Sequence, residues 1–335
     1  MKVVVDDKIP YIREVIARVA DEVVYLPGSA ISADDVHDAD ALIVRTRTRC
    51  NRRLLEGSRV QFIATATIGF DHLDTEYLRQ AGIVWTNCPG CNASSVAQYL
   101  HTSLLLLEQE RGLRLSHSTL GVVGVGHVGT LVAMVGQRLG MNVLLCDPPR
   151  AEQGEEGFLP LETLMAEADV ISFHTPLVRS GNHPTLHMAD EAFFRALARK
   201  PIIINTSRGE VVDGKALLKA LDEGWVKEAI VDVWENEPDI DLHLLERVYL
   251  GTPHIAGYSA DGKANATRMS LEALCRHFGV THGDFGITPP PAPSSAHRDE
   301  PLSLYDPRND SEALKVHPEL FEHLRGNYPL RREKV

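Results

Sequence analysis

A glycine-rich turn lies between a strand-like run and a helix-like run in the middle of the chain. Gly124–Gly129 reads Gly-Val-Gly-His-Val-Gly and directly follows the β-branched run Thr119–Val123. In such a GxGxxG turn the glycines permit a tight bend, close backbone approach to a pyrophosphate and close packing of the helix on the strand. Free N–H groups at the helix start then face the phosphates. The pattern predicts a doubly wound α/β domain with a dinucleotide site.

An acidic residue stands where the adenosine ribose of such a dinucleotide is expected. Asn142–Cys146 reads as the next strand and is followed by Asp147, 18 residues after the last glycine. A carboxylate there binds the ribose hydroxyls and repels a 2′-phosphate, which favours NAD over NADP. Arg150, three residues further on, could pair with such a phosphate, and we interpret it as a solvated loop side chain. The expected cofactor contacts at this turn are Gly124, Gly126, His127, Val128, Gly129 and Asp147.

Strand-like and helix-like stretches alternate along most of the chain, a pattern typical of βαβ units and parallel sheets. The first set of expected strands is Val3–Val5, Val23–Leu26, Ala41–Arg45, Val60–Ala64 and Val84–Thr86, with helices that include Tyr11–Val19 and Asp74–Ala81. The second set is Thr119–Val123, Asn142–Cys146, Val170–Phe173, Ile202–Asn205, Ala229–Asp232 and Val248–Leu250. Ser94–Arg111 reads as a crossover helix and Ser259–Phe278 as a closing helix.

The 335 residues are enough for about two domains. We predict a flavodoxin-like substrate domain from residues 1–93 and 259–285, and a Rossmann NAD-binding domain from residues 94–258. Residues 286–335 would form a Pro/Ser-rich linker, from Thr288 to Ala296, and a short C-terminal extension.

Composition excludes several classes of protein. The formal charge of −12 argues against binding to nucleic-acid backbones. No apolar run approaches the ~18 residues of a membrane helix. Acids follow the apolar start Met1–Val5 at once, unlike a secretory signal, so a cytoplasmic chain is expected. Five scattered cysteines do not suggest a disulfide framework. We interpret Cys88-Pro-Gly-Cys91 as two thiols in a turn.

Three chemically active side chains follow three successive strands of the second set. Arg208 comes after Ile202–Asn205, Glu237 after Ala229–Asp232, and His254 after Val248–Leu250. Open α/β sheets bind ligands at these strand ends. A guanidinium can hold a carboxylate in a fork, an imidazole can exchange a proton with a hydroxyl, and a carboxylate can orient the imidazole. Beside a nicotinamide, this set is suited to hydride transfer from a 2-hydroxy acid, and it calls for no metal.

The motifs around these residues resemble those of the D-isomer-specific 2-hydroxyacid dehydrogenases. They are GVVGVGHVG (121–129), HTPL (174–177), INTSRGEVVD (204–213), VDVWENEP (231–238) and TPHIAGYS (252–259). The resemblance implies that Arg208, Glu237 and His254 are catalytic, with His254 as the proton donor in the reductive direction. It also implies contacts of NAD with Thr175, Thr206, Ser207, Arg208, Asp232 and Gly257, and of substrate with Thr46, Thr67 and Tyr258.

Further pieces resemble one branch of that family, which oxidises a phosphorylated four-carbon 2-hydroxy acid in pyridoxal 5′-phosphate synthesis. They are CDPPRAEQGEEG (146–157), PGCNA (89–93), DGKA (261–264), LYDPRND and NYPLRRE. The branch implies a cytoplasmic homodimer. Gln98 stands where we expect an acid in this branch, and we interpret it as a surface difference.

The substrate is open to alternatives. Arg45, Arg47 and Arg49 alternate after a strand and could hold a phosphate, with Arg45 the first candidate and Arg47 the second. A 3-phosphoglycerate, glycerate or lactate dehydrogenase would keep the same chemistry with another substrate. A non-catalytic NAD-sensing protein, like some corepressors of this fold, is the alternative of another class.

The C-terminal segment looks shorter than that of the family. Leu320, Phe321, Leu324 and Tyr328 have helical spacing on a segment too short for its own core. The stripe must therefore pack on its own second domain or on a partner, and we favour a dimer.

Overall fold

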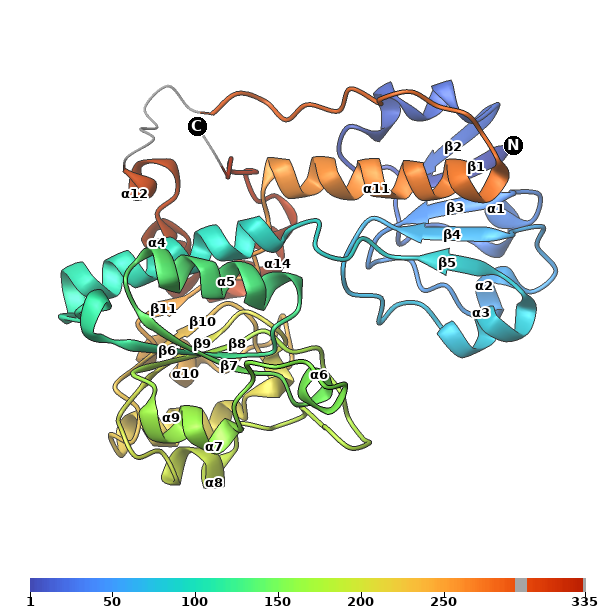
Figure 1. The fold of residues 1–335 in the computed structure, drawn as a ribbon. Helices are drawn as coiled ribbons and strands as arrows, with labels where there is room; N and C mark the ends of the chain where they lie inside the picture. The colour runs from blue at the N-terminus through green and yellow to red at the C-terminus, as the bar shows by residue number, and fades with distance from the viewer. Residues whose placement is uncertain (293–299, 334–335) are drawn as a thin grey trace. The chain divides into compact units, whose positions relative to one another are not determined.

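The computed structural model describes residues 1–292 and 300–333, and part of the expected linker lies outside them. The chain divides into two compact units. The first comprises residues 1–92 and 259–291, and the second comprises residues 93–258 together with the C-terminal segment from 292 onward. The described helices and strands of each unit are shown in Figure 1.

The first unit is built on a parallel sheet of order β2-β1-β3-β4-β5. The strands are β1 (Lys2–Asp6), β2 (Glu22–Leu26), β3 (Ala41–Val44), β4 (Phe62–Thr65) and β5 (Val84–Thr86). Alternate strand residues point to opposite faces, so Val3 and Ile43 pack under α11 (Ala260–Phe278). Val4 and Leu42 face the other layer. That layer contains α1 (Ala33–Val36), α2 (Arg52–Leu55) and α3 (Thr75–Ala81).

The prediction of one continuous helix at Tyr11–Val19 is wrong. The structure has two 3₁₀ turns there, η1 (Ile12–Glu14) and η2 (Ile16–Arg18), and Tyr11 adopts a left-handed conformation at φ 65°. Ile12, Val15 and Ile16 are buried. Their β-branched side chains lose rotamer freedom in an α-helix, so the sequence favours tighter, shorter turns over the same apolar face.

The second unit contains a parallel sheet of order β11-β10-β9-β8-β6-β7. Its strands are β6 (Thr119–Val123), β7 (Asn142–Cys146), β8 (Val170–Phe173), β9 (Ile202–Asn205), β10 (Glu228–Val231) and β11 (Leu250–Gly251). The last strand is shorter than expected, because Val248 ends the preceding helix instead. The order runs one way from β6 to β7 and the other way from β6 to β8. A doubly wound sheet binds its ligand at this reversal.

Helices cover both faces of this sheet (Figure 1). One layer contains α4 (Ala93–Arg111) and α5 (His127–Arg138), which pack against Val122 and Ile204. The other contains α7 (Leu161–Glu167), α8 (Glu191–Arg195), α9 (Gly214–Asp222) and α10 (Leu242–Arg247), which pack against Ile171 and Ile203. Short elements α6 (Pro148–Glu152), η3 (Leu115–His117) and η4 (Gly209–Val211) complete the connections. The expected α/β class, with two doubly wound parallel sheets, is confirmed.

The C-terminal segment packs on the second unit. It forms α12 (Pro301–Leu304), α13 (Pro307–Val316), η5 (Pro318–Leu320) and α14 (Phe321–Gly326). Leu314 and Phe321 are buried in the same apolar cluster as α9 and α10. The Gly251 N–H of edge strand β11 donates a hydrogen bond to Ser311 Oγ at 3.0 Å. An exposed edge strand invites pairing with another chain, and α13 satisfies a donor at this edge. Leu320 is exposed, unlike the rest of the expected stripe.

Arg331 ties this segment to the long helix α4. Its guanidinium is buried, donates hydrogen bonds to the Ala256 and Ile255 carbonyls, and lies over the Tyr305 ring at 3.9 Å. Gln98 on α4 accepts a further bond from Arg331 Nε at 2.9 Å and donates one to the Arg332 carbonyl. The interpretation of Gln98 as a surface difference is therefore wrong, because the folded segment covers it.

The five cysteines all lie within the described residues, are buried and form no disulfide. Gly90 adopts φ 78° in the turn between Cys88 and Cys91. Burial raises the pKa of the Cys88 thiol to about 11, although a hydrogen bond with Ser270 opposes this rise. A protonated, buried thiol is a poor redox group, so the pair is structural. Among the described residues, the structure contains no helix whose apolar stretch could span a lipid bilayer.

Candidate active site

The glycine turn between β6 and α5 has the close contacts that its sequence predicts. A Cβ on Gly124, which has φ +84°, would lie 2.9 Å from the His174 carbonyl after β8. A Cβ on Gly129 would lie 2.0 Å from the Gly124 carbonyl oxygen. A Cβ on Gly126 would meet nothing within 4 Å, so this side of the turn is open. His127 and Val128 begin α5, with His127 exposed. The turn is therefore closed toward the protein and open where a pyrophosphate would approach.

Asp147 lies at the end of β7 and is bonded to this turn. Its carboxylate accepts hydrogen bonds from the Val125 N–H at 2.8 Å and the Arg150 N–H at 3.2 Å. The Arg150 side chain differs from expectation: it forms an ion pair with Glu155 and packs over the Phe158 ring. Glu155 thus neutralises the guanidinium that a 2′-phosphate would need, which supports NAD as the nucleotide.

Two further side chains lie at the reversal between β6 and β8. Thr175 Oγ1 is buried and has no hydrogen-bond partner within the described residues. Such orphaned atoms cost free energy unless a ligand or water satisfies them, and a dinucleotide beside the glycine turn would do so. His174 bonds to Ser172 Oγ at 2.8 Å and to Thr206 Oγ1 at 3.4 Å. Burial lowers the pKa of His174 to about 3, so the ring is neutral at pH 7.

The three expected catalytic residues follow three neighbouring strands. β9, β10 and β11 are adjacent and parallel, so their carboxyl ends lie on one edge of the sheet. Arg208 follows β9 in an extended conformation, and its guanidinium donates to the Ser207 carbonyl at 2.8 Å. Ser207 is itself bonded to the buried Asn205 side chain. A Cβ on Gly209 would lie 2.1 Å from the Trp234 carbonyl, so the loops after β9 and β10 are in tight contact.

His254 and Glu237 form a direct pair. The His254 Nδ1 lies 2.8 Å from Glu237 Oε2 and 3.1 Å from Oε1. The His254 side chain is 26% exposed and that of Glu237 is 16% exposed. Burial would raise the pKa of Glu237, but hydrogen bonds from His254 and the Trp234 N–H, together with charge, lower it. With Nδ1–H donating to this carboxylate, Nε2 is left as the proton acceptor.

Asp232 supports the loop that carries His254. Its fully buried carboxylate accepts hydrogen bonds from Thr252 Oγ1 at 2.6 Å, the Ile255 N–H at 2.8 Å and the Ala256 N–H at 2.9 Å. His254 adopts φ 57°, which is unusual for a residue other than glycine. Strained conformations of this kind persist where the surroundings over-determine them. Asp232 therefore positions His254, a role that the sequence did not reveal.

The expected substrate residues are divided between the units. In the first unit, Thr46 follows β3 and Thr67 follows the adjacent β4, with Thr67 Oγ1 bonded to Thr65 and to the Gly69 carbonyl. Arg45 Nη1 donates to the Lys8 carbonyl at 3.2 Å. Thr46, Arg47 and Arg49 are exposed. In the second unit, Tyr258 and Gly257 follow His254 and are half-buried.

Sequence reasoning missed one residue of this site. Arg325 on α14 donates to Glu237 Oε2 and to the Tyr258 hydroxyl, each at 3.3 Å. Its signal was weak: Arg325 lies within the segment of Leu320, Phe321, Leu324 and Tyr328, which the sequence associated with assembly and not with chemistry.

Comparisons with known proteins agree with this geometry. Residues 96–256 match the family described as D-isomer specific 2-hydroxyacid dehydrogenase, NAD binding domain. The erythronate-4-phosphate dehydrogenase of Bacteroides fragilis is 58% identical over 340 residues, covering 100% of this chain and 97% of the relative. The protein of the same name from Porphyromonas gingivalis is 44% identical over 346 residues, covering 99% and 94%.

Solved structures show the same architecture. An NAD-bound 3-phosphoglycerate dehydrogenase of Entamoeba histolytica aligns with a TM-score of 0.70 at 26% identity, covering 86% of this chain and 97% of that one. A D-lactate dehydrogenase of Aquifex aeolicus, complexed with NAD and lactic acid, aligns at 0.69 with 26% identity, covering 84% and 96%. The chain belongs to the D-isomer-specific 2-hydroxyacid dehydrogenases, the NAD-dependent family in which its full-length relatives are the erythronate-4-phosphate dehydrogenases.

Proposed function

We propose that this chain oxidises 4-phospho-D-erythronate to 2-oxo-3-hydroxy-4-phosphobutanoate, with NAD as the hydride acceptor. The observation that carries the chemistry is the contact between His254 Nδ1 and Glu237 Oε2 at 2.8 Å, which leaves Nε2 as a base. The full-length identity to relatives named for this substrate supports the choice among 2-hydroxy acids. The reaction would serve pyridoxal 5′-phosphate synthesis.

The proposed mechanism divides the work among three side chains. When bound, the nicotinamide supplies the site that receives the hydride from C2. His254 Nε2 takes the proton of the C2 hydroxyl as the C2–O bond becomes a carbonyl, and Glu237 stabilises the imidazolium that results. Arg208 holds the substrate carboxylate and polarises the reacting oxygen through its guanidinium. In the reverse direction His254 returns the proton.

The remaining expected residues are proposed as binding groups. Gly124, Gly126, Gly129, Asp147 and Thr175 would hold NAD at the reversal between β6 and β8, with Thr206, Ser207, Asp232 and Gly257 nearer the reacting end. Thr46, Thr67 and Tyr258 would bind the substrate. Arg45 is the first candidate for binding the substrate phosphate, because its guanidinium lies at the Lys8 carbonyl, just after the end of β1.

NAD reduction by the purified protein tests the proposal. We expect 4-phospho-D-erythronate to give the highest kcat/KM in a panel with 3-phosphoglycerate, D-glycerate and D-lactate. A preference for any other member would leave the chemistry intact and replace the substrate. No turnover of the whole panel, together with measurable NAD binding, would favour the NAD-sensing alternative.

Cytoplasmic location and a homodimer complete the proposal, and both are supported by the family resemblance. Light scattering of the full chain at micromolar concentration should give twice the mass of 37.0 kDa. A monomer would show that the C-terminal segment serves only its own second unit.

A further inference from the structure

The C-terminal segment delivers a cation to the catalytic pair. Arg325 Nη1 lies 3.3 Å from Glu237 Oε2, the oxygen that is also closest to His254 Nδ1, at 2.8 Å. Arg325 Nε donates to the Tyr258 hydroxyl at 3.3 Å. Glu237 Oε2 is thus shared between the imidazole of His254 and the guanidinium of Arg325, which reaches it from α14.

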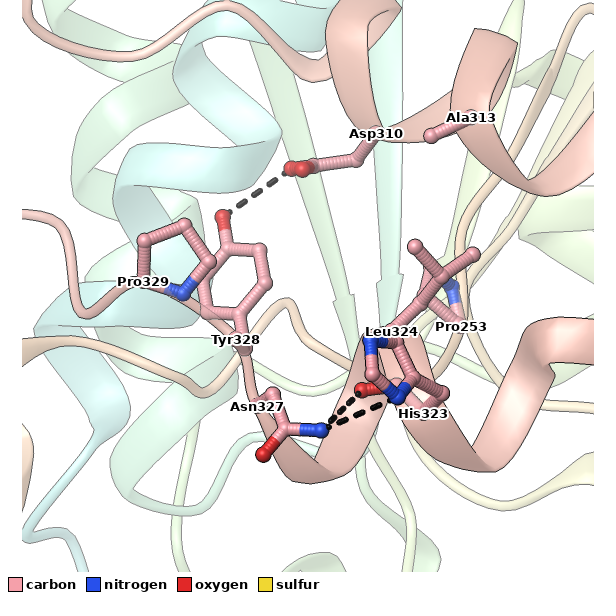
Figure 2. A pocket seen from close by; sticks show the side chains of 8 residues that line it. All are labelled: Pro253, Asp310, Ala313, His323, Leu324, Asn327, Tyr328 and Pro329. Carbon is pink, nitrogen blue, oxygen red and sulfur yellow. Dashed lines mark hydrogen bonds between the residues drawn. The ribbon is translucent and has the colours of Figure 1, made fainter.

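Packing fixes the helix that carries Arg325. Phe321 on α14 is 1% exposed, and Leu324 packs against the same apolar cluster. Just after the helix, the Tyr328 hydroxyl donates to the Asp310 carboxylate at 3.0 Å, and the Tyr328 ring meets the Tyr258 ring edge to face. Figure 2 shows the Tyr328–Asp310 bond beside a hollow that Pro253, the residue before His254, also lines. The Arg325 side chain itself is only 23% exposed.

The charge of Arg325 opposes that of a protonated His254. A proton arriving at His254 creates a second cation next to the one carboxylate, and two cations that share an anion each gain less from it. Other titratable groups that interact with this trio include Asp232 from the end of β10, Tyr258 from the loop after β11 and Glu322 from α14. All are held in the second unit, so the balance is set within it.

We propose that Arg325 is a positioning residue that holds the Glu237 carboxylate and limits how strongly it stabilises protonated His254, thereby setting the pH range of the reaction. The inference rests on the proposed role of His254 as the base. It assigns the C-terminal segment a part in the chemistry, in addition to covering the edge strand. Arg325 is not a catalytic residue in this proposal, because it contacts Glu237 and the Tyr258 hydroxyl and not the reacting atoms.

The test is the pH profile of kcat/KM for NAD reduction by the full chain. Oxidation needs neutral His254, so the acid limb reports its protonation. Arg325→Met removes the competing cation, and the acid limb should move to higher pH by about 0.5 to 1 unit. Glu237→Gln removes the anion, and the limb should move to lower pH by about 1 unit. Arg325→Lys keeps the charge and should restore most of the wild-type profile.

A control variant separates this effect from general damage to the segment. Arg308 also lies in it but pairs with Asp306 and Glu110, so Arg308→Met should keep the wild-type profile. If Arg325→Met is unstable, Arg325→Gln provides the same readout with a polar side chain. An acid limb that stays in place, or moves downward, in a folded Arg325 variant would overturn the proposal.

An NMR titration of the His254 ring in the protein without substrate gives a readout that turnover does not affect. The His254 signal is identified by its loss in His254→Gln. In Arg325→Met, the midpoint of this NMR titration should move to higher pH, as the acid limb of kcat/KM does. If no substrate is oxidised but this shift appears, the proposed function fails while the role of Arg325 stands. If 4-phospho-D-erythronate is oxidised but the shift is absent, the role proposed for Arg325 fails while the proposed function stands.

Discussion

His254 is expected to carry the largest single effect on turnover. Positioned proton transfer contributes ~10²–10⁴-fold, so His254→Ala should lose about that much kcat. Binding of NAD, measured by calorimetry, should be unchanged, because the imidazole contacts Glu237 and not the glycine turn. Wild-type turnover in this variant would remove His254 from the mechanism.

His174 should make the stability of the fold depend on pH. Burial lowers the pKa of His174 to about 3, from 6.5 for an ordinary histidine. The unfolded chain therefore binds a proton below about pH 6.5 that the folded chain refuses, and stability falls as the pH drops from there toward 3. His174→Gln stays neutral, so its melting temperature should fall less steeply between pH 6.5 and 4.

An exposed histidine provides the control for that experiment. His317 is 58% exposed in its pair with Glu319, and His317→Gln should keep the wild-type slope of melting temperature against pH. Equal slopes for wild type and His174→Gln would show that His174 is not held neutral.

Asp147 should decide the choice of nucleotide. The native protein is expected to bind NAD more tightly than NADP, because the carboxylate repels a 2′-phosphate and Arg150 is paired with Glu155. Asp147→Ala should weaken the binding of NAD and narrow the difference in affinity between NAD and NADP. Titration of both nucleotides measures this, and tighter binding of NADP by the native protein would contradict it.

At the scale of elements, the loop after β9 depends on contact with the loop after β10. A methyl group on Gly209 would lie 2.1 Å from the Trp234 carbonyl, so one loop must move. Gly209→Ala should lower the free energy of unfolding by about 1–3 kcal/mol. It should also lower kcat, because a shift of this loop would move Arg208 away from Glu237 and His254 at the ends of the neighbouring strands. Gly283 has open space around it, and Gly283→Ala is the matched control for both chemical denaturation and turnover. Equal behaviour of the two variants would show that the contact is unimportant.

For the whole molecule, Arg331 is expected to hold the C-terminal segment in place. It donates to the backbone carbonyls of Ser95, Ile255 and Ala256, all of which lose a partner in Arg331→Met. The Ile255 carbonyl keeps the Tyr258 N–H as a donor and the Ala256 carbonyl keeps Ser95 Oγ, so the loss is that of buried hydrogen bonds from a charged group. The free energy of unfolding should therefore drop by about 1.5–3 kcal/mol. Arg199, half-exposed beside Asp169, is the control: Arg199→Met should cost less than about 1 kcal/mol. Denaturant titration of both variants decides between them.

Much of this protein follows from local sequence patterns. Alternating β-branched runs and helical stretches predict two parallel sheets, because strand and helix periodicities depend only on neighbouring residues. The Gly124–Gly129 turn predicts its own geometry, because only glycine fits where the turn meets the His174 carbonyl. Because Arg208, Glu237 and His254 each follow a strand, and parallel strands end on the same side of a sheet, the sequence also predicts that the three side chains lie at one edge of the second sheet.

Only the tertiary structure decided what depends on residues far apart in the chain. Arg325 reaches Glu237 across 88 residues, and Arg331 reaches Ser95 across 236. No periodicity records such contacts, because they arise when an apolar segment with too little core of its own covers the edge of a sheet. The same cause brought Gln98 into hydrogen bonds with Arg331 and Arg332. Local patterns thus determined the elements and the reactive set, whereas long-range packing determined the charges and supports around that set.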